Sequence, residues 1–276
     1  MSREVQKGNP SPGERKPGNR GSEAAPGWER YTRQLNMRDW DSRAQKKLEC
    51  SHVTVAGAGG LGSPVLLYLA AAGIGEIRII DNDTVQLSNL NRQILYKEGD
   101  IGSYKTRSAS GSLSELNSDI HIESSTGTIT EETIEEIISP THVIVDCLDN
   151  YRTRFLLNRY CVAHGIPLVH GGIEGFYGQI STVLPGITPC LECMYAGLED
   201  PKDENGHLRP KPVIGAAVGV IGSLQALEVI KLITGLGELI TNRLLIFDGM
   251  EGRFDEIAIE RDKTCSICGT YEENSV

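Results

Sequence analysis

Short apolar runs alternate with helix-like segments through the middle of the chain. The runs are rich in Val and Ile, as buried strands are, and they lie at 52–56, 76–81, 120–124, 141–147 and 167–170. Helices are predicted at 29–35, 43–50, 63–72, 105–116, 131–138 and 152–164. Strands that alternate with helices predict a parallel sheet whose strands are joined by right-handed crossovers.

The pattern changes after residue 172. One antiparallel strand is predicted at 179–184 and a closing pair at 244–247 and 254–260, with a long apolar helix at 216–234. The predicted fold class is therefore α/β. It is a Rossmann-like sheet, mostly parallel with antiparallel C-terminal strands, and it has helices on both faces.

The start of the chain differs in composition from the rest. Residues 1–27 are rich in Pro, Gly, Ser and charge and hold almost nothing apolar to bury, so we predict a disordered tail. We interpret residues 28–276 as a single domain, because no internal repeat divides them.

Charge and hydropathy exclude some functions. The net charge of −10 argues against a general nucleic-acid binder, which needs clustered Lys and Arg. No secretory signal precedes the domain, and the uncharged stretches at 51–75 and 212–227 are better interpreted as strand–turn–helix and as a buried helix than as membrane spans. We expect a cytoplasmic protein that binds neither nucleic acid nor a membrane.

A glycine-rich turn follows the first predicted strand. Gly57, Gly59 and Gly62 fit the pattern G-x-G-x-x-G, with Gly60 between them, and the turn opens a helix. Asp81 ends the next strand, where an acidic residue commonly accepts hydrogen bonds from ribose hydroxyls. The turn alone indicates an NAD-binding domain, or a merely structural turn.

The residues beyond Asp81 favour a nucleoside triphosphate. Arg92 and Lys105 could offset phosphate charge, and Asp149 could hold Mg²⁺ between phosphates. A dehydrogenase has no chemical need for this set. The alternative is that these cations are ordinary surface charges.

Four of the seven cysteines form two Cys-x-x-Cys pairs, Cys190/Cys193 and Cys265/Cys268. Two such pairs can complete a closed tetrahedral Zn–S₄ site, so we predict a structural zinc clip. A redox-active pair or free core thiols are the alternatives.

Together these residues resemble the ThiF/MoeB/HesA family, the prokaryotic relatives of ubiquitin-activating enzymes, and MoeB most in type. Both Cys-x-x-Cys pairs and the glycine turn belong to the resemblance. The other matching residues are Arg30-Tyr31-x-Arg33-Gln34, Asp81-x-Asp83-x-Val85, Ser88-Asn89-Leu90-x-Arg92-Gln93, Lys105 and Asp146-Cys147-x-Asp149-Asn150.

The resemblance implies an enzyme, an ATP-dependent adenylyltransferase. Such enzymes join AMP to the C-terminal glycine of a small ubiquitin-like sulfur-carrier protein ending in Gly-Gly and release pyrophosphate. In the family this serves molybdopterin or thiamin biosynthesis. Residues 28–172 would be the nucleotide-binding half, and residues 173–276 the carrier-binding and zinc half.

The resemblance also assigns roles to residues. Asp81 would hold the ribose, Asp149 would hold Mg²⁺, and the glycine turn with Asp83 would line the nucleotide. The triphosphate would be bound by Asn89, Arg92, Gln93 and Lys105. In the family, the residue at Arg33 reaches into the partner's site of a homodimer, so we expect a homodimer here.

The remaining cysteines and histidines are given structural roles. We predict that Cys50, Cys147 and Cys161 are small core residues and that His142, His164 and His170 are structural, and no His–acid pair stands out in the sequence. Some family members carry a reactive Cys before the long apolar helix, but this chain has none from 194 to 264. That departure favours an enzyme that only adenylates.

Three other functions stay open on the sequence. They are an NAD-dependent oxidoreductase, a tRNA-modifying dehydratase of the same family, and a non-catalytic zinc-stabilised scaffold. The loop at 197–211 either closes over the carrier tail or is a solvated connector. We expect the sulfur donor to be a separate protein, because the chain ends six residues after Thr270.

Overall fold

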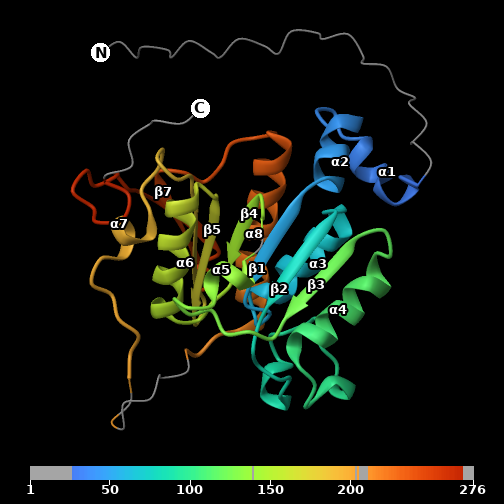
Figure 1. Cartoon of the computed structure of the whole chain (residues 1–276), viewed down its shortest axis with the longest axis horizontal. Coiled ribbons are helices and arrows are strands. Elements are labelled where there is room, and N and C mark those ends of the chain that lie inside the picture. The colour runs from blue at the N-terminus through green and yellow to red at the C-terminus, as the bar shows by residue number, and fades with distance from the viewer. Residues whose placement is uncertain (1–26, 139, 203, 205–210, 270–276) are drawn as a thin grey trace, which may run out of the picture.

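The computed structural model describes residues 27–138, 140–202, 204 and 211–269. Residues 1–26 of the predicted tail and part of the 197–211 loop lie outside these residues. Among the described residues, eight strands form one sheet in the order β3-β2-β1-β4-β5-β6-β7-β8 (Figure 1). The strands are β1 His52–Ala56, β2 Glu76–Ile80, β3 His121–Ser125, β4 Val143–Asp146, β5 Leu168–Glu174, β6 Tyr177–Val183, β7 Arg243–Asp248 and β8 Arg253–Ala258.

The sheet has a parallel half and an antiparallel half. Strands β1 to β5 pair in parallel, with Val55 of β1 opposite Ile79 of β2 and Val145 of β4. Strands β6, β7 and β8 continue the sheet in antiparallel pairs. The predicted fold class is therefore confirmed.

Helices cover both faces of the sheet (Figure 1). They are α1 Thr32–Leu35, α2 Ser42–Glu49, α3 Gly62–Ala72, α4 Lys105–Leu116, α5 Ile134–Ile137, α6 Tyr151–His164, α7 Leu191–Tyr195 and α8 Gly215–Thr234. Helices α2, α3, α4 and α8 share one core with alternate strand residues such as Val145. Helices α5, α6 and α7 share the second core with the other set, such as Ile144. This alternation follows from the two-residue period of a strand that is buried on both faces.

Helix α8 is apolar and central. By length and hydropathy it is the one helix among the described residues that could span a membrane, a test that buried core helices also pass. It packs against α3, α2 and strands β4, β5 and β6, and Val229 and Ile221 are fully buried. These contacts agree with the predicted core helix.

Two predicted elements differ from the observed ones by more than the one or two residues at an end seen elsewhere. Helix α5 begins at Ile134 rather than 131, because the Thr133 hydroxyl donates to the Thr128 carbonyl at 2.6 Å and accepts from the Thr130 N–H at 3.0 Å. Such side-chain bonds compete with helical ones. Strand β5 runs four residues past His170, because the glycines beyond it pair with β6.

Two features were not predicted. Helix α7 begins inside the first cysteine pair, where no helix was predicted. Cys50 is exposed at the end of α2, so its prediction as a core residue is wrong. The prediction holds for Cys147 and Cys161, which are buried.

The carboxyl ends of β1 and β4 lie side by side where the direction of strand order reverses. In doubly wound sheets this switch point is where ligands bind. Gly57 follows β1 with a φ of +97°, and a side chain there would meet the Cys147 carbonyl at 2.7 Å. The close approach of these two backbones therefore requires glycine.

Gly62 is required by sterics rather than by φ. A Cβ at this position would stand 2.1 Å from the Gly57 carbonyl oxygen. We expect Gly62→Ala to lower the free energy of unfolding by about 2–3 kcal/mol, because backbone must move to admit the methyl group. Chemical denaturation would measure the loss.

The matched control is Gly111→Ala in α4. A Cβ at Gly111 meets nothing within 4 Å, so this change should stabilise the helix by up to about 1 kcal/mol. Equal effects of the two substitutions would contradict the steric argument.

Candidate nucleotide site and cysteine cluster

A cleft of about 640 Å³ opens at the switch point. It is bounded by the ends of β1, β2 and β4 on one side and by the β5–β6 hairpin on the other. Its lining includes Gly57, Gly59, Gly60, Asp81, Asp83, Arg92, Gln93, Lys105 and Asp149, all of which the sequence singled out. Residues from five separate segments therefore meet in one cavity.

The glycine turn is held to the end of β2. The Asp81 carboxylate accepts the Ala58 N–H at 2.8 Å and the Asp83 N–H at 2.9 Å. A Cβ at Gly59 would meet only the Gln93 amide at 3.6 Å, which is ordinary contact. No contact among the described residues thus demands glycine at position 59, whereas close approach of a phosphate would.

Lys105 is buried between two carboxylates. Its ammonium lies 2.7 Å from the Asp83 carboxylate and 3.9 Å from that of Asp81. Burial raises the pKa of Asp81, and Lys105 and the two N–H donors oppose that rise. The ammonium is consequently fixed at the cleft wall, where it can offset the charge of a bound anion.

Arg92 and Gln93 face the glycine turn from the other side. The guanidinium donates to the Ser88 carbonyl at 2.9 Å, and the Arg92 stem lies beside Gly60. The amide oxygen of Gln93 is buried and accepts no hydrogen bond from any residue that the structure describes. A buried acceptor without a donor is costly, so this atom fits a ligand that supplies one, such as a nucleotide hydroxyl or amine.

Asp149 stands exposed just after β4. Asn150 beside it caps α6 by accepting the Thr153 N–H at 2.9 Å. A carboxylate on a loop that is pinned on both sides suits Mg²⁺, which takes one or two carboxylates and completes its shell with water and phosphate.

Three predicted site residues do not line the cleft. Gly62 lies behind it at the start of α3. The Asn89 side chain instead accepts the Gln86 N–H at 3.1 Å within the short turn Leu87–Asn89. Arg33 is exposed on α1, so within one chain it contributes nothing to the cleft.

Other lining residues were missed by the sequence interpretation. Arg154 donates to the carbonyls of Leu148 and Gly171, and Lys211 and Gln179 line the same cleft. No motif marks them, because they enter through the pairing of β4 with β5 and β6. The only local signal for Arg154 is that it is a cation in the first turn of the helix that Asn150 caps.

The structure forms a His–acid pair that did not stand out in the sequence. His170 Nδ1 lies 2.7 Å from the Asp146 carboxylate, and both side chains are fully buried. Nε2 of His170 lies 3.2 Å from the Tyr195 hydroxyl. The pair lies beneath the cleft wall and does not line it, so its role is to hold the wall in place.

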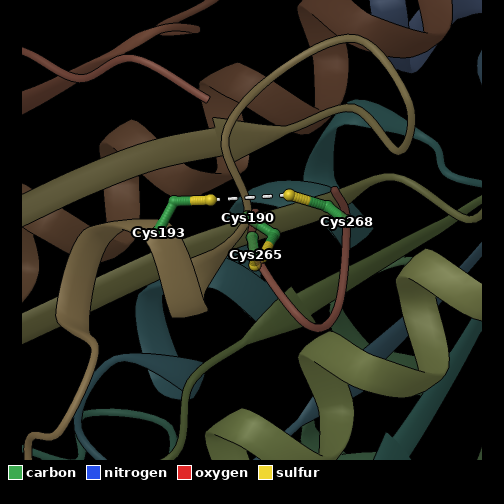
Figure 2. Close-up of side chains that lie close together, drawn as sticks. All are labelled: Cys190, Cys193, Cys265 and Cys268. Carbon is green, nitrogen blue, oxygen red and sulfur yellow. Dashed lines mark hydrogen bonds between the residues drawn. The ribbon is translucent and has the colours of Figure 1, made fainter. Parts of the chain in front are cut away.

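The four paired cysteines converge, as Figure 2 shows. Their sulfurs all lie within 4.8 Å of one another, with Cys190 and Cys265 at 3.8 Å and Cys193 and Cys268 at 3.4 Å. A tetrahedral site with bonds of about 2.3 Å places its sulfurs about 3.8 Å apart. The arrangement therefore fits a closed four-thiolate zinc site.

The surroundings of the cluster agree with a bound cation. Burial raises the pKa of the Cys190 thiol well above its ordinary value and that of Cys193 to about 11, whereas at Cys265 hydrogen bonds outweigh burial and lower the pKa. The first two thiols lose their protons only beside a strong positive charge, which Zn²⁺ provides. Arg261 donates to the carbonyls of Gly186 and Cys268, which links the segment before the first cysteine pair to the second pair.

Comparison with known proteins identifies the family. The ThiF family profile matches residues 31–267. The chain belongs to the ThiF family. This confirms the resemblance drawn from the motifs and favours nucleotide activation over an NAD-dependent oxidoreductase.

Relatives within the ThiF family extend over most of the chain. The SAMP-activating enzyme E1 of Haloferax volcanii is 37% identical over 248 residues, which cover 90% of this chain and 91% of that protein. The adenylyltransferase and sulfurtransferase MOCS3 of Dictyostelium discoideum is 44% identical, over 87% of this chain. The chain spans 57% of that MOCS3, little more than half its length.

Solved structures share the fold. E. coli MccB in complex with MccA-N7isoASN superposes with a TM-score of 0.79 at 28% identity, over 88% of this chain and 75% of that one. E. coli MccB with ATP gives a TM-score of 0.73 at 28% identity, over 82% and 69%.

The buried His170 should make stability pH-dependent. Burial lowers the pKa of His170 below its ordinary 6.5, although Asp146 opposes the shift. The unfolded chain therefore takes up this proton first, so stability is present above pH 6.5 and is lost as the pH falls. One proton changes the free energy of unfolding by at most about 1.4 kcal/mol per pH unit.

We expect His170→Gln to flatten this acid loss between pH 7.5 and 5.5 in denaturant titrations, although the variant is less stable throughout. His121→Gln, at an exposed position on β3, is the control and should keep the wild-type slope. A wild-type slope in His170→Gln would show that the acid loss arises elsewhere.

The cysteine cluster should bind one zinc ion per chain. We expect Cys193→Ser to abolish zinc retention through gel filtration and to lower the Tm by roughly 10 °C. Exposed Cys50→Ser should leave both unchanged. Full zinc content in Cys193→Ser, measured by inductively coupled plasma mass spectrometry, would rule out the four-thiolate site.

Proposed function

We propose that this protein binds Mg-ATP in the cleft and transfers AMP to the C-terminal glycine carboxylate of a small ubiquitin-like sulfur-carrier protein. The observation that carries the proposal is the gathering of Arg92, Lys105, Asp149 and the unpartnered Gln93 oxygen around the glycine turn. The ThiF family membership and the adenylyltransferase named among its relatives support the same reaction.

The nucleotide would lie along the glycine turn. The ribose would approach Asp81 at the end of β2, and the phosphates would pass Gly59, where no side chain intrudes. No side chain caps the start of α3, so an anion there would meet the positive end of the helix dipole.

The charges of the cleft suit phosphoryl chemistry. Arg92 and Lys105 would offset the triphosphate charge, and Asp149 would hold Mg²⁺, which supplies further charge neutralisation when bound. One carboxylate oxygen of the carrier attacks the α-phosphorus, an O–P bond forms, and the bond to the bridging oxygen breaks with its electron pair leaving on pyrophosphate. The attacking carboxylate is already ionised at neutral pH, so no general base is needed.

The carrier would dock beside the antiparallel half of the sheet. The β5–β6 and β7–β8 turns lie next to each other, because the Gly249 N–H donates to the Phe176 carbonyl at 3.0 Å. Phe176, Tyr177 and Met250 are all exposed there, and Tyr177 lines the cleft. An apolar rim at the mouth of the cleft suits a protein substrate whose tail enters it.

Finer points of the proposal come from the sequence. The chain has no Cys from 194 to 264, so we propose adenylation without a covalent carrier–cysteine step. We also propose a homodimer in which Arg33 acts at the partner's cleft, a zinc ion in the cysteine cluster, and work in the cytoplasm. Molybdopterin and thiamin biosynthesis are both candidate pathways, and a tRNA-modifying dehydratase is the runner-up.

Pyrophosphate exchange tests the proposal. We expect exchange into ATP that depends on a carrier ending in Gly-Gly, and we expect Lys105→Ala to lower kcat/KM about 10²–10³-fold through lost charge neutralisation. Lys97→Ala, at the exposed position just before the short turn Glu98–Asp100, is the control and should keep wild-type rates.

Two outcomes would overturn the proposal. One is exchange that is absent with every carrier and appears with a tRNA nucleoside carboxylate instead. The other is calorimetric preference for NAD over Mg-ATP, which would restore the oxidoreductase hypothesis.

A further inference from the structure

Lys211 is a cation of the cleft that the adenylation chemistry leaves without a role. It lies just before α8 and lines the same cavity as Asp149. Its backbone is fixed, because the Gly175 N–H donates to the Pro212 carbonyl at 2.6 Å and the Ile214 N–H donates to the Gly175 carbonyl at 3.2 Å. The β5–β6 turn therefore holds this lysine at the cleft.

The ammonium of Lys211 has no anionic partner among the described residues. It is half-buried over the Tyr151 ring, 4.6 Å from the ring centroid, and forms no hydrogen bond or ion pair there. Burial and the nearby Arg154 lower its pKa, and Asp200, Asp149 and Glu174 act in the opposite direction from a distance. An anion that reached this ammonium would thus be bound favourably.

Two of the carboxylates near Lys211 already have a hydrogen-bond partner or a proposed ligand. Both Asp200 oxygens accept the Tyr151 N–H, at 2.9 and 2.8 Å, at the start of α6. Asp149 is the proposed magnesium ligand. With Glu174 these groups place three negative charges around one ammonium, which repels a polyphosphate more strongly than a singly charged group.

We propose that Lys211 binds the C-terminal carboxylate of the acceptor and so selects a free carboxylate over a neutral chain end. The inference rests on the proposed function and adds the recognition of its second substrate. Arg92 and Lys105 already serve the nucleotide end of the cleft, whereas Lys211 stands with Tyr177 on the hairpin side, where the carrier would enter.

The interaction should act on binding rather than on the chemical step. Lys211 contacts the non-attacking oxygen and stays protonated throughout. The carboxylate loses its charge as its other oxygen bonds to the α-phosphorus, so the attraction is stronger before the reaction than in the transition state. Such an interaction lowers KM without raising kcat.

A double-mutant cycle tests the proposal. The wild type and Lys211→Met are titrated with a Gly-Gly-ended carrier that supports exchange, and with the same carrier ending in a carboxamide, both in the presence of Mg²⁺ and a non-hydrolysable ATP analogue. We expect the amide to weaken wild-type binding about tenfold to hundredfold. Lys211→Met should bind both carriers equally weakly and Lys211→Arg should recover part of the preference.

Two readouts separate this role from a structural one. Lys211→Met should raise the carrier KM without lowering kcat, and its Kd for Mg-ATP should stay within twofold of wild type. Lys97→Met serves as the control. Retained discrimination between carboxylate and amide in Lys211→Met would overturn the proposal, and so would a fall in Mg-ATP affinity, which would place the lysine on the phosphates.

A second arm does not depend on any carrier. Acetylation of Lys211 by acetic anhydride is followed by mass spectrometry in the wild type with millimolar N-acetylglycylglycine or its amide. We expect the carboxylate to slow modification of Lys211 and the amide to have no effect. If no carrier supports exchange, the proposed function fails, but the acetylation experiment still tests the carboxylate site. Equal rates of Lys211 acetylation with the carboxylate and the amide would refute that site.

Discussion

A single buried carboxylate organises the centre of this protein. Asp146 is fully buried at the end of β4, where an unpaired charge would cost several kcal/mol. Burial alone would raise its pKa, but Arg154 at 3.7 Å and His170 at 2.7 Å hold the pKa below its ordinary value. Asp146 also accepts the Leu148 N–H at 3.0 Å. These contacts fix the backbone that leads to Asp149, because the buried Asp146 carboxylate would lose its stabilising partners if it moved.

The same buried network reaches the cysteine cluster. His170 lies between Asp146 and Tyr195, and Tyr195 ends α7, the helix that begins at the first cysteine pair. From the other side, Gln225 of α8 donates to the Asp146 carbonyl at 2.8 Å, which is possible because Gly171 leaves room for its side chain. The cysteine cluster, the core helix and the cleft wall are therefore connected through one hydrogen-bond network. Loss of one member is expected to disturb the others.

The sequence alone predicted the features that depend on residues close together in the chain. The glycine turn, Asp81 and the cysteine pairs were recognisable because each needs fixed residue types at short spacing, and the strand rhythm predicted the parallel half of the sheet. The pair of His170 with Asp146 was missed because 24 residues separate them and only the β4–β5 register brings them together. Lys211 was missed for the same reason, since its position depends on a bridge to Gly175. Local hydrogen bonds of Thr133 shortened α5 against its helical pattern.

On the proposed function, the change from parallel to antiparallel pairing divides the cleft between two substrates. In the parallel half, the chain leaves the carboxyl ends of β1, β2 and β4 through loops that begin helices, and these loops hold the nucleotide-side residues. In the antiparallel half, β5 and β7 end at the same edge in hairpin turns, which bring Phe176 beside Gly249. A small molecule can be enclosed on the first side, whereas the second side admits a protein tail. On the proposed function, the topology itself thus orients the carboxylate toward the α-phosphate, and the few cations on each side only have to neutralise the charge of the substrate that enters there.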